Sequence, residues 1–310
     1  MPTKPSLPPP HPSAAELASV LRTIRTLGRT LSAEVLADSQ RLYAPFHQSE
    51  PYTGVRLSRD LRYGPDERQR LDVFNATATA SAASRPALVF VHGGGFTGGD
   101  KHRAGSPFND HVGVWAARND LVGINMTYRL APRHPWPAGP EDIAAAVGWI
   151  HRNAAEYGID RNRIFLFGQS AGAAHAAAYI GHPAFHPQEG HGLAGGILLS
   201  GVYDLAASNP KSIATGYFGD NPGLYGERSS ILGLSKSELP LLLAVAQYEP
   251  SHFERQALRL ALAICDRRRP LPRFLQLADH NHFSGLFHLG LPQDVLGTEI
   301  LKFMEDRTCT

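Results

Sequence analysis

Short apolar runs recur along most of the chain, and segments with helical spacing lie between them. The runs show no regular polar position, so we interpret them as strands buried on both faces. They lie at residues 87–91, 121–126, 164–167, 196–200, 241–246 and 274–278. One intervening segment has the i, i+4, i+7, i+11 spacing of a helix face, at Ile143, Val147, Ile150 and Ala154. This alternation predicts an α/β protein with a mostly parallel sheet and helices on both of its faces.

The first fifty residues follow a different pattern. Residues 1–12 contain six prolines, which cannot supply helical hydrogen bonds, so we expect a Pro-rich flexible tail. Between residues 13 and 50, Val20, Ile24 and Leu27 follow helical spacing. This spacing predicts an N-terminal helical cap segment.

A hairpin is predicted between the cap segment and the alternating region. Residues 56–61 and 70–75 have the short period of strands, and Gly64-Pro65-Asp66-Glu67 between them is a turn signal. Together with the six apolar runs, these strands give an eight-stranded sheet. Because we find no internal repeat and no linker, we predict that residues 13–310 form a single domain.

The composition is that of a globular protein, with 43% hydrophobic and 19% charged residues. The formal net charge is +2 and the basic residues are spread along the chain, so we expect no nucleic-acid partner. The two cysteines, Cys265 and Cys309, are far apart and indicate neither a disulfide framework nor a thiolate metal site. The fifteen histidines are scattered, with no His-Glu-x-x-His spacing. We expect most of them at the surface, and we expect no metal or other cofactor.

The sequence also bears on the compartment. No apolar run approaches the roughly 20 residues that span a bilayer, so we expect no stable membrane insertion. The chain starts Met1-Pro2-Thr3-Lys4-Pro5 and continues into further prolines, without a hydrophobic signal segment. These features predict a cytoplasmic protein.

The sharpest chemical signal is a serine between glycines at a predicted strand-to-helix turn. Gly168-Gln169-Ser170-Ala171-Gly172 follows the run 164–167 and precedes an Ala-rich helical segment. In a G-x-S-x-G turn the serine backbone is strained, and the flanking glycines remove side chains that would collide. The Ser170 hydroxyl is then exposed as a nucleophile, and the Ala171 N–H at the helix start can donate to a developing oxyanion. The alternative is that Ser170 only caps the helix.

A glycine-rich segment further upstream fits the same chemistry. His92-Gly93-Gly94-Gly95-Phe96 comes directly after the run 87–91, where such a loop supplies further N–H donors to the oxyanion. The alternative is a phosphate-binding loop, which would need a Gly-Lys-Ser/Thr ending or a G-x-G-x-x-G motif at the start of a helix, and neither is present in full. We therefore interpret the segment as part of an oxyanion hole.

The acid is expected next along the chain, because the order after a nucleophile turn of this kind is acid and then histidine. Glu249 follows the run 241–246 and precedes Pro250. This places Glu249 at the carboxyl end of a strand, where open α/β sheets carry their chemistry. Glu254 is the competitor, but Ser251-x-x-Glu254 ahead of a helical stripe predicts a capping box.

The candidate base lies just after the run 274–278. His280 and His282 are two residues apart, and either could accept the Ser170 proton while the carboxylate orients its ring. His288 is a weaker candidate because it falls inside the following segment. The residues alone do not distinguish His280 from His282.

Together these motifs resemble the hormone-sensitive-lipase-like esterases of the α/β-hydrolase fold, over roughly residues 55–303. The segment 128–138, Tyr-Arg-Leu-Ala-Pro-Arg-His-Pro-Trp-Pro-Ala, is similar to that group's segment after the fourth strand. This chain departs from the lipase-like pattern at Gln169, where Asp is usual, and at Arg133, where Glu is usual.

Other segments resemble the neighbouring kynurenine formamidases and small feruloyl-esterase-like carboxylesterases. They are Tyr63-Gly64-Pro65, Ser200-Gly201-Val202-Tyr203-Asp204-Leu205 and His282-Phe283. In that branch the catalytic histidine is followed directly by Phe, so the resemblance favours His282 over His280.

The resemblance also implies roles for individual residues. The oxyanion donors correspond to Gly94, Gly95 and Ala171, and the acid position corresponds to Glu249. The implied activity is that of a serine carboxylesterase acting on small-molecule esters with short to medium acyl or aryl parts, through an acyl-enzyme intermediate. Arylformamidase activity on N-formylkynurenine-type amides is the alternative, and an inactive ligand-binding protein is a third hypothesis. A homodimer is compatible with the resemblance.

Overall fold

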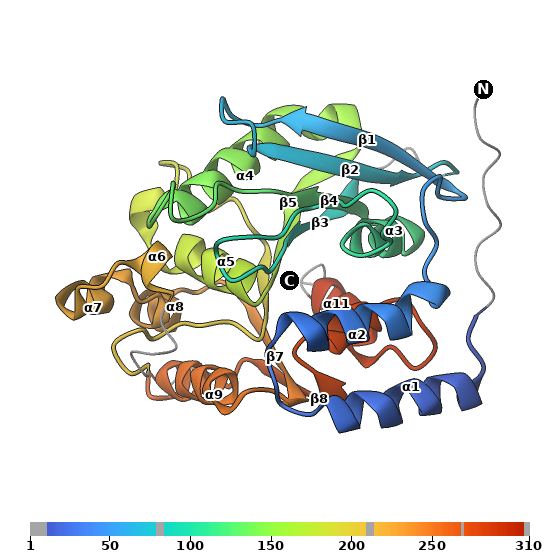
Figure 1. The fold of residues 1–310 in the computed structure, drawn as a ribbon. Coiled ribbons are helices and arrows are strands. Elements are labelled where there is room, and N and C mark those ends of the chain that lie inside the picture. Colours follow the sequence, from blue (N-terminus) through green and yellow to red (C-terminus); the bar gives the residue numbers. More distant parts are fainter. Residues whose placement is uncertain (1–10, 79–83, 209–213, 268–269, 307–310) are drawn as a thin grey trace.

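The computed structural model describes residues 11–78, 84–208, 214–267 and 270–306. Its centre is a sheet of eight strands in the order β1-β2-β4-β3-β5-β6-β7-β8 (Figure 1). The strands are β1 (Val55–Arg62), β2 (Arg70–Ala76), β3 (Arg85–Val91), β4 (Val122–Met126), β5 (Ile159–Gln169), β6 (Gly195–Leu199), β7 (Leu241–Tyr248) and β8 (Arg273–Asn281). The eight-stranded sheet predicted from the sequence is confirmed.

The strands are mostly parallel, as predicted. β1 pairs antiparallel with β2, and β2 pairs antiparallel with β4, whereas the pairs from β4 through to β8 are parallel. β5 begins at Ile159 rather than at Ile164, because the polar stretch 160–163 hid its first half from the apolar pattern. Ile159 nevertheless pairs with Arg85 of β3, so the central strands are longer than the sequence indicated.

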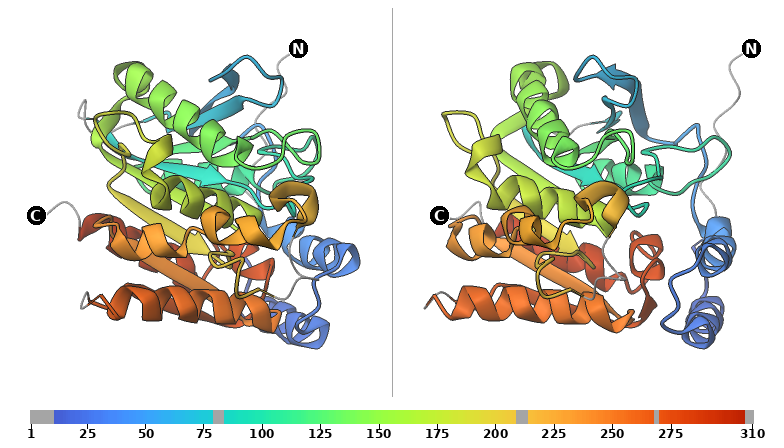
Figure 2. Two further views of the ribbon diagram at one scale, coloured as in Figure 1. Left: turned by 90° about the vertical axis from the view of Figure 1, so that its left-hand side faces the viewer. Right: turned by 60° about the vertical axis from the view of Figure 1, so that its left-hand side comes forward.

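Helices cover both faces of this sheet (Figure 2). In the described ranges the α-helices are α1 (Ala14–Leu27), α2 (Ala33–Tyr43), α3 (Asp110–Arg118), α4 (Ala138–Tyr157), α5 (Ala171–Gly181), α6 (Thr215–Phe218), α7 (Tyr225–Arg228), α8 (Ile231–Lys236), α9 (Ser251–Cys265), α10 (Ser284–Phe287) and α11 (Val295–Glu305). None of them is both long enough and apolar enough to cross a bilayer.

Alternate residues of the central strands enter two hydrophobic cores, one on each side of the sheet. On β3, Leu88 and Phe90 pack in a core that includes residues of α3 and α11. Val89 and Val91 pack in the other core, with residues of α4, α5, α8 and α9. Because successive side chains of a strand point to opposite faces, a strand covered on both sides needs apolar residues at every position. This requirement explains the unbroken apolar runs in the sequence.

The helical segment predicted for residues 13–50 forms α1 and α2. α1 lies along β8 (Figure 1). α2 lies against α10. Leu17 and Ile24 of α1 are buried in a cluster with Tyr43 of α2 and Phe287 of α10. The start of the chain therefore packs against its end. Of the Pro-rich tail predicted at residues 1–12, residues 1–10 lie outside the described ranges.

Helix α5 packs very closely against the sheet. A Cβ atom on Gly172, near the start of α5, would lie 2.0 Å from the carbonyl oxygen of Val91 in β3. A Cβ atom on Gly168, at the end of β5, would lie 2.4 Å from the carbonyl oxygen of Gly172. Real Cβ atoms do not approach a backbone oxygen so closely, so the two glycines allow the helix to begin directly beside the strand ends.

We predict that Gly172→Ala lowers the free energy of unfolding by about 1–3 kcal/mol or more, because overpacking forces a backbone shift. Gly148→Ala in α4 is the matched control. Its Cβ would meet only the flexible end of Arg152 at 3.3 Å, and Ala is favoured over Gly within a helix, so stability should stay the same or rise. Urea unfolding measures both variants, and equal losses of stability would contradict this packing argument.

Candidate active site

Ser170 occupies the sharp turn between β5 and α5. β5 ends at Gln169 and α5 begins at Ala171, so Ser170 alone connects them. Its backbone has φ 55° and ψ −119°, a combination that residues with a Cβ rarely adopt. The Ser170 N–H donates to the Leu199 carbonyl at 2.9 Å, which holds the turn. The Ser170 side chain makes no capping hydrogen bond to α5, so the alternative that it serves as a helix cap is wrong.

The Ser170 hydroxyl is one end of a chain of two hydrogen bonds. Ser170 Oγ lies 2.8 Å from His282 Nε2, and His282 Nδ1 lies 2.7 Å from Glu249 Oε2. A carboxylate can only accept, so Nδ1 carries the imidazole proton and Nε2 is left to accept the serine hydroxyl. The three residues directly follow β5, β7 and β8, which places them together at the carboxyl edge of the sheet.

The structure shows which of the two candidate histidines, His280 or His282, lies beside Ser170. His280 Nδ1 lies 3.1 Å from Ser284 Oγ, and its ring lies 5.0 Å from that of His288. Burial and the nearby His288 lower the pKa of His280 to about 3. His288 in turn bonds through Nε2 to the Pro292 carbonyl at 2.9 Å. His282 is therefore the histidine that the fold brings to Ser170.

The capping box predicted at Ser251 and Glu254 is wrong. α9 begins at Ser251, the residue before it is Pro250, and no side chain caps this helix. Glu254 instead accepts a hydrogen bond from Arg29 at 2.9 Å. Glu254 was expected to cap the start of α9, but its carboxylate pairs instead with Arg29, on the loop between α1 and α2.

Three groups hold Glu249 in place. The Ser200 hydroxyl donates to Glu249 Oε1, the Ala246 N–H reaches the same oxygen at 3.3 Å, and Arg29 Nη1 donates to the Glu249 carbonyl at 2.8 Å. The Glu249 side chain is 0% exposed, and an unpaired buried carboxylate would be costly. Ser200 belongs to a family-like segment of the sequence, but the sequence alone did not indicate its contact with Glu249. Its positive φ of 55° shows that the backbone, too, is unusual at this point.

The glycine-rich loop lies beside Ser170. A Cβ atom on Gly93 would lie 3.2 Å from Ser170 Cβ, so there is little room for a side chain between the loop and the serine. Gly94 and Gly95 have φ values of 137° and 61°, which favour glycine. Within the described residues, no oxygen accepts a hydrogen bond from the N–H of Gly94, Gly95 or Ala171. These donors are free to bind an anion.

Two buried histidines, His92 and His175, pack with aromatic residues beside this loop. Tyr128 donates to the His92 carbonyl at 2.8 Å, and its ring stacks on that of His92 at 4.4 Å. His175 of α5 packs edge-on against the other aromatic rings, 4.4 Å from Tyr128 and 5.2 Å from Phe96. Burial lowers the pKa of His92 to about 4 and that of His175 to about 3, so both are neutral at pH 7. Of the fifteen histidines, five are buried, nine are half-buried and His11 is exposed, so fewer of them are fully exposed than the sequence suggested.

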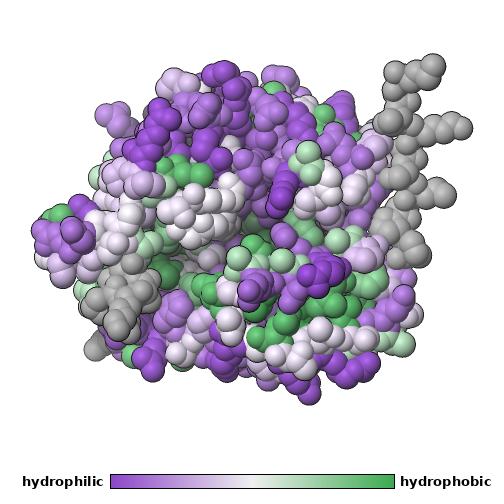
Figure 3. Space-filling model, viewed as in Figure 1, coloured by the Kyte–Doolittle hydropathy of each residue, from purple (hydrophilic) through white to green (hydrophobic). Residues whose placement is uncertain are grey.

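Apolar side chains lie close to Ser170 and the glycine-rich loop. Phe96 stacks on Tyr217 at 4.8 Å and belongs to a cluster that includes Ala171. A cavity of about 550 Å³ lies beside the glycine-rich loop and is bounded by Gly94, Gln169 and residues of α2 and α10. Figure 3 shows a hollow in the middle of this face, with apolar side chains around it.

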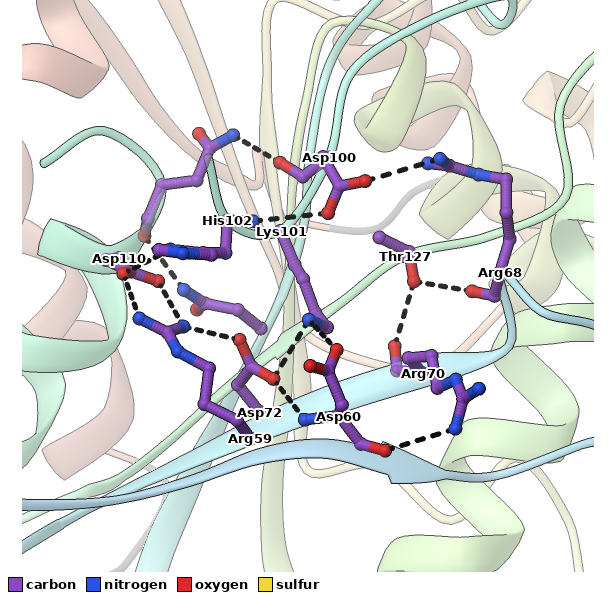
Figure 4. A network of polar contacts seen from close by, with 12 residues as sticks. Arg59, Asp60, Arg68, Arg70, Asp72, Asp100, Lys101, His102, Asp110 and Thr127 are labelled. Carbon is purple, nitrogen blue, oxygen red and sulfur yellow. Dashed lines mark hydrogen bonds and ion pairs between the residues drawn. The ribbon is translucent and has the colours of Figure 1, made fainter. Parts of the chain in front are cut away.

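In the part of the chain that the structure describes, one group of three side chains has the makeup of a metal site. Ligand atoms of Glu50, His102 and Asp110 lie within 4.8 Å of one another. However, Arg59 donates to Glu50 at 2.7 Å and to Asp110 at 2.6 Å, and Figure 4 shows its guanidinium beside Asp110. A cation thus already balances these carboxylates, and we interpret the group as an ion-pair network.

Comparison with known proteins identifies the family. Residues 88–262 match the α/β-hydrolase fold, which is more than half of the chain. The chain belongs to the α/β-hydrolase family. The fold class and the resemblance inferred from the sequence are therefore confirmed.

Named relatives within the α/β-hydrolase family are esterases. Esterase LipQ of Mycobacterium tuberculosis is 26% identical over an alignment of 240 residues that covers 72% of this chain and 56% of LipQ. Carboxylic ester hydrolase LipN of the same organism is 30% identical over an alignment of 236 residues that covers 68% of this chain and 60% of LipN. The chain thus spans less than two thirds of the length of either relative. The crystal structure of esterase B from Lactobacillus rhamnosis has a TM-score of 0.71 at 19% identity, covering 95% of this chain and 96% of that one, and shows the shared fold.

Proposed function

We propose that this protein is a serine carboxylesterase that works through an acyl-enzyme intermediate. The observation that carries the proposal is the chain of hydrogen bonds from Ser170 through His282 to Glu249. We assign Ser170 as the nucleophile, His282 as the general base and Glu249 as the acid that orients the imidazole. The names of the relatives LipQ and LipN support the same reaction class.

In the first half of the reaction, Ser170 Oγ attacks the ester carbonyl carbon while His282 Nε2 takes the hydroxyl proton. The carbonyl oxygen becomes an oxyanion, which the N–H groups of Gly94, Gly95 and Ala171 are placed to bind. One such donor contributes about 3–4 kcal/mol to lowering the barrier in enzymes of this type. Collapse of the intermediate breaks the bond to the alcohol oxygen, and the alcohol leaves with the proton from His282.

In the second half, water replaces the alcohol. His282 Nε2 takes a proton from water, and the hydroxide formed attacks the acyl carbon of the Ser170 ester. The same N–H groups bind the second oxyanion. Release of the carboxylic acid returns the proton to Ser170 Oγ, and Glu249 stays ionised throughout as the partner of the imidazolium.

The substrates we propose are esters with short to medium acyl or aryl parts. A cavity of about 550 Å³, closed on one side by α2, suits an arm of that size. An arylformamidase would use the same nucleophile and base, and a direct comparison of substrates separates the two activities. The cytoplasmic location and the homodimer stay predictions from the sequence.

We predict that Ser170→Ala and His282→Ala each lower the hydrolysis of p-nitrophenyl esters by roughly 10⁴-fold or more, whereas His280→Asn retains activity. Rates on a chain-length series from acetate to octanoate, set beside the rate on N-formylkynurenine, give the substrate class. Unfolding curves check that each variant is folded. An active Ser170→Ala variant would contradict the mechanism, and a dead His280→Asn with an active His282→Ala would overturn the base assignment.

Ser200 provides a second test, because its buried hydroxyl donates to Glu249. A hydrogen bond to a charged group contributes about 1.5–3 kcal/mol, so Ser200→Ala should lower kcat by about tenfold or more and leave KM unchanged. Ser229→Ala is the matched control, since that buried hydroxyl bonds to the backbone of Leu205 and Tyr225. Steady-state kinetics on one p-nitrophenyl ester measure both. Equal effects on kcat in the two variants would show that Ser200 does not act through Glu249.

A further inference from the structure

The cavity beside the oxyanion loop adjoins the reacting groups. Its lining includes Gly93 and Gly94 of the loop, Gln169 just before the nucleophile, and Phe283 just after the base. Gln169 Nε2 also donates to the His282 carbonyl at 3.1 Å, which ties this wall to the histidine loop. One arm of an ester bound at Ser170 would extend into this space.

The lining combines apolar side chains, mostly from the helices, with polar side chains, mostly from the loop before α3. The apolar side chains are Leu36, Phe108, Phe283, Leu286 and Phe287. The polar ones include Asp100, His102, Arg103 and Ser106, together with Gln40 of α2. Such a cavity fits a ligand arm that is apolar along its length and carries a polar group.

Only three of the lining residues carry a titratable side chain, and two of them are already paired. Asp100 lies 3.3 Å from Arg68 Nη1, and it also accepts from the backbone N–H of His102 at 3.3 Å. His102 Nδ1 lies 2.8 Å from Asp110 Oδ2. Figure 4 shows both partners, with the His102 ring directed to Asp110.

Arg103 is the third titratable residue of the cavity lining. It is exposed, and among the described residues nothing forms an ion pair or side-chain hydrogen bond with it. Among the titratable residues of the cavity lining, Arg103 is therefore the one whose charge is not balanced by a described side chain. The planar guanidinium of an arginine binds a carboxylate through two parallel hydrogen bonds, which fix the orientation of the carboxylate and strengthen its binding.

We propose that this cavity takes the arm of an ester that bears a carboxylate, and that Arg103 determines this specificity. The proposal rests on the esterase function proposed above. The apolar side chains cover the carbon chain between the ester and the carboxylate, and Arg103 pairs with the carboxylate at its end. The preferred substrates are then monoesters of dicarboxylic acids, or esters whose alcohol carries a carboxylate.

The test compares each anionic ester with a neutral ester of the same shape. For the acyl side, the pair is the mono-p-nitrophenyl ester of adipic acid and the analogue with an isopropyl group in place of the carboxylate. For the alcohol side, the pair is a carboxyphenyl butyrate and the matching isopropylphenyl butyrate. Arg103→Gln should raise KM for at least one anionic ester by about tenfold, equal to about 1.4 kcal/mol, and change its neutral partner less than about twofold.

Two controls accompany this comparison. Arg56→Gln removes an exposed arginine of β1 that does not line the cavity, and it should change neither ester of a pair. Arg103→Lys keeps the charge without the planar guanidinium and should restore part of the lost affinity. The effect of Arg103 should also weaken as salt is added, because the pair is exposed to solvent.

The outcomes separate this proposal from the esterase function. If Arg103→Gln raises KM equally for both members of each pair, or for no anionic ester, the cavity assignment is overturned. The esterase function still stands in that case, provided that hydrolysis of the neutral esters depends on Ser170. If that hydrolysis persists at the wild-type rate in Ser170→Ala, the esterase function itself is contradicted.

Discussion

The approach of helix α5 to the backbone of β3 determines the geometry of the whole site. At Gly172 no side chain fits between the helix and the Val91 carbonyl, so the helix can begin immediately where β5 ends. One residue must then make the entire turn, and Ser170 does so at a φ of 55°. The same geometry directs its hydroxyl to His282 and leaves the first N–H of the helix without an intrahelical acceptor. A packing constraint thus creates both the turn that carries the proposed nucleophile and part of the proposed anion site.

The N-terminal helices contribute to this site as well as covering it. Arg29 donates to the Glu249 carbonyl at 2.8 Å, and Ser39 accepts from Asn281, next to His282, at 3.1 Å. The loops of the proposed acid and base are therefore both attached to the first fifty residues. Leu36, from the same segment, lines the cavity beside the oxyanion loop. One segment of the chain thus supports the proposed catalytic groups and bounds the space for the substrate.

Local patterns in the sequence were enough to predict the sheet and the serine turn, because unbroken apolar runs and paired glycines reflect packing within a few residues. Contacts between distant residues were not predictable in this way. His280 and His282 follow the same strand, and only the positions of Ser284 and Glu249 in space separate them. Ser200 carries no pattern of its own, and its role depends on a residue 49 positions away. The capping box failed for the same reason, since the partner of the carboxylate came from the other end of the chain.

The central claim is that Ser170 is a nucleophile activated by His282. Labelling with a p-nitrophenyl alkylphosphonate, followed by mass spectrometry of the digested protein, tests it most directly, because such a reagent stays on the atom that attacks it. We expect one adduct, on Ser170, formed at a rate that falls by orders of magnitude in His282→Ala. An adduct on another residue, or the same rate of labelling without His282, would contradict it.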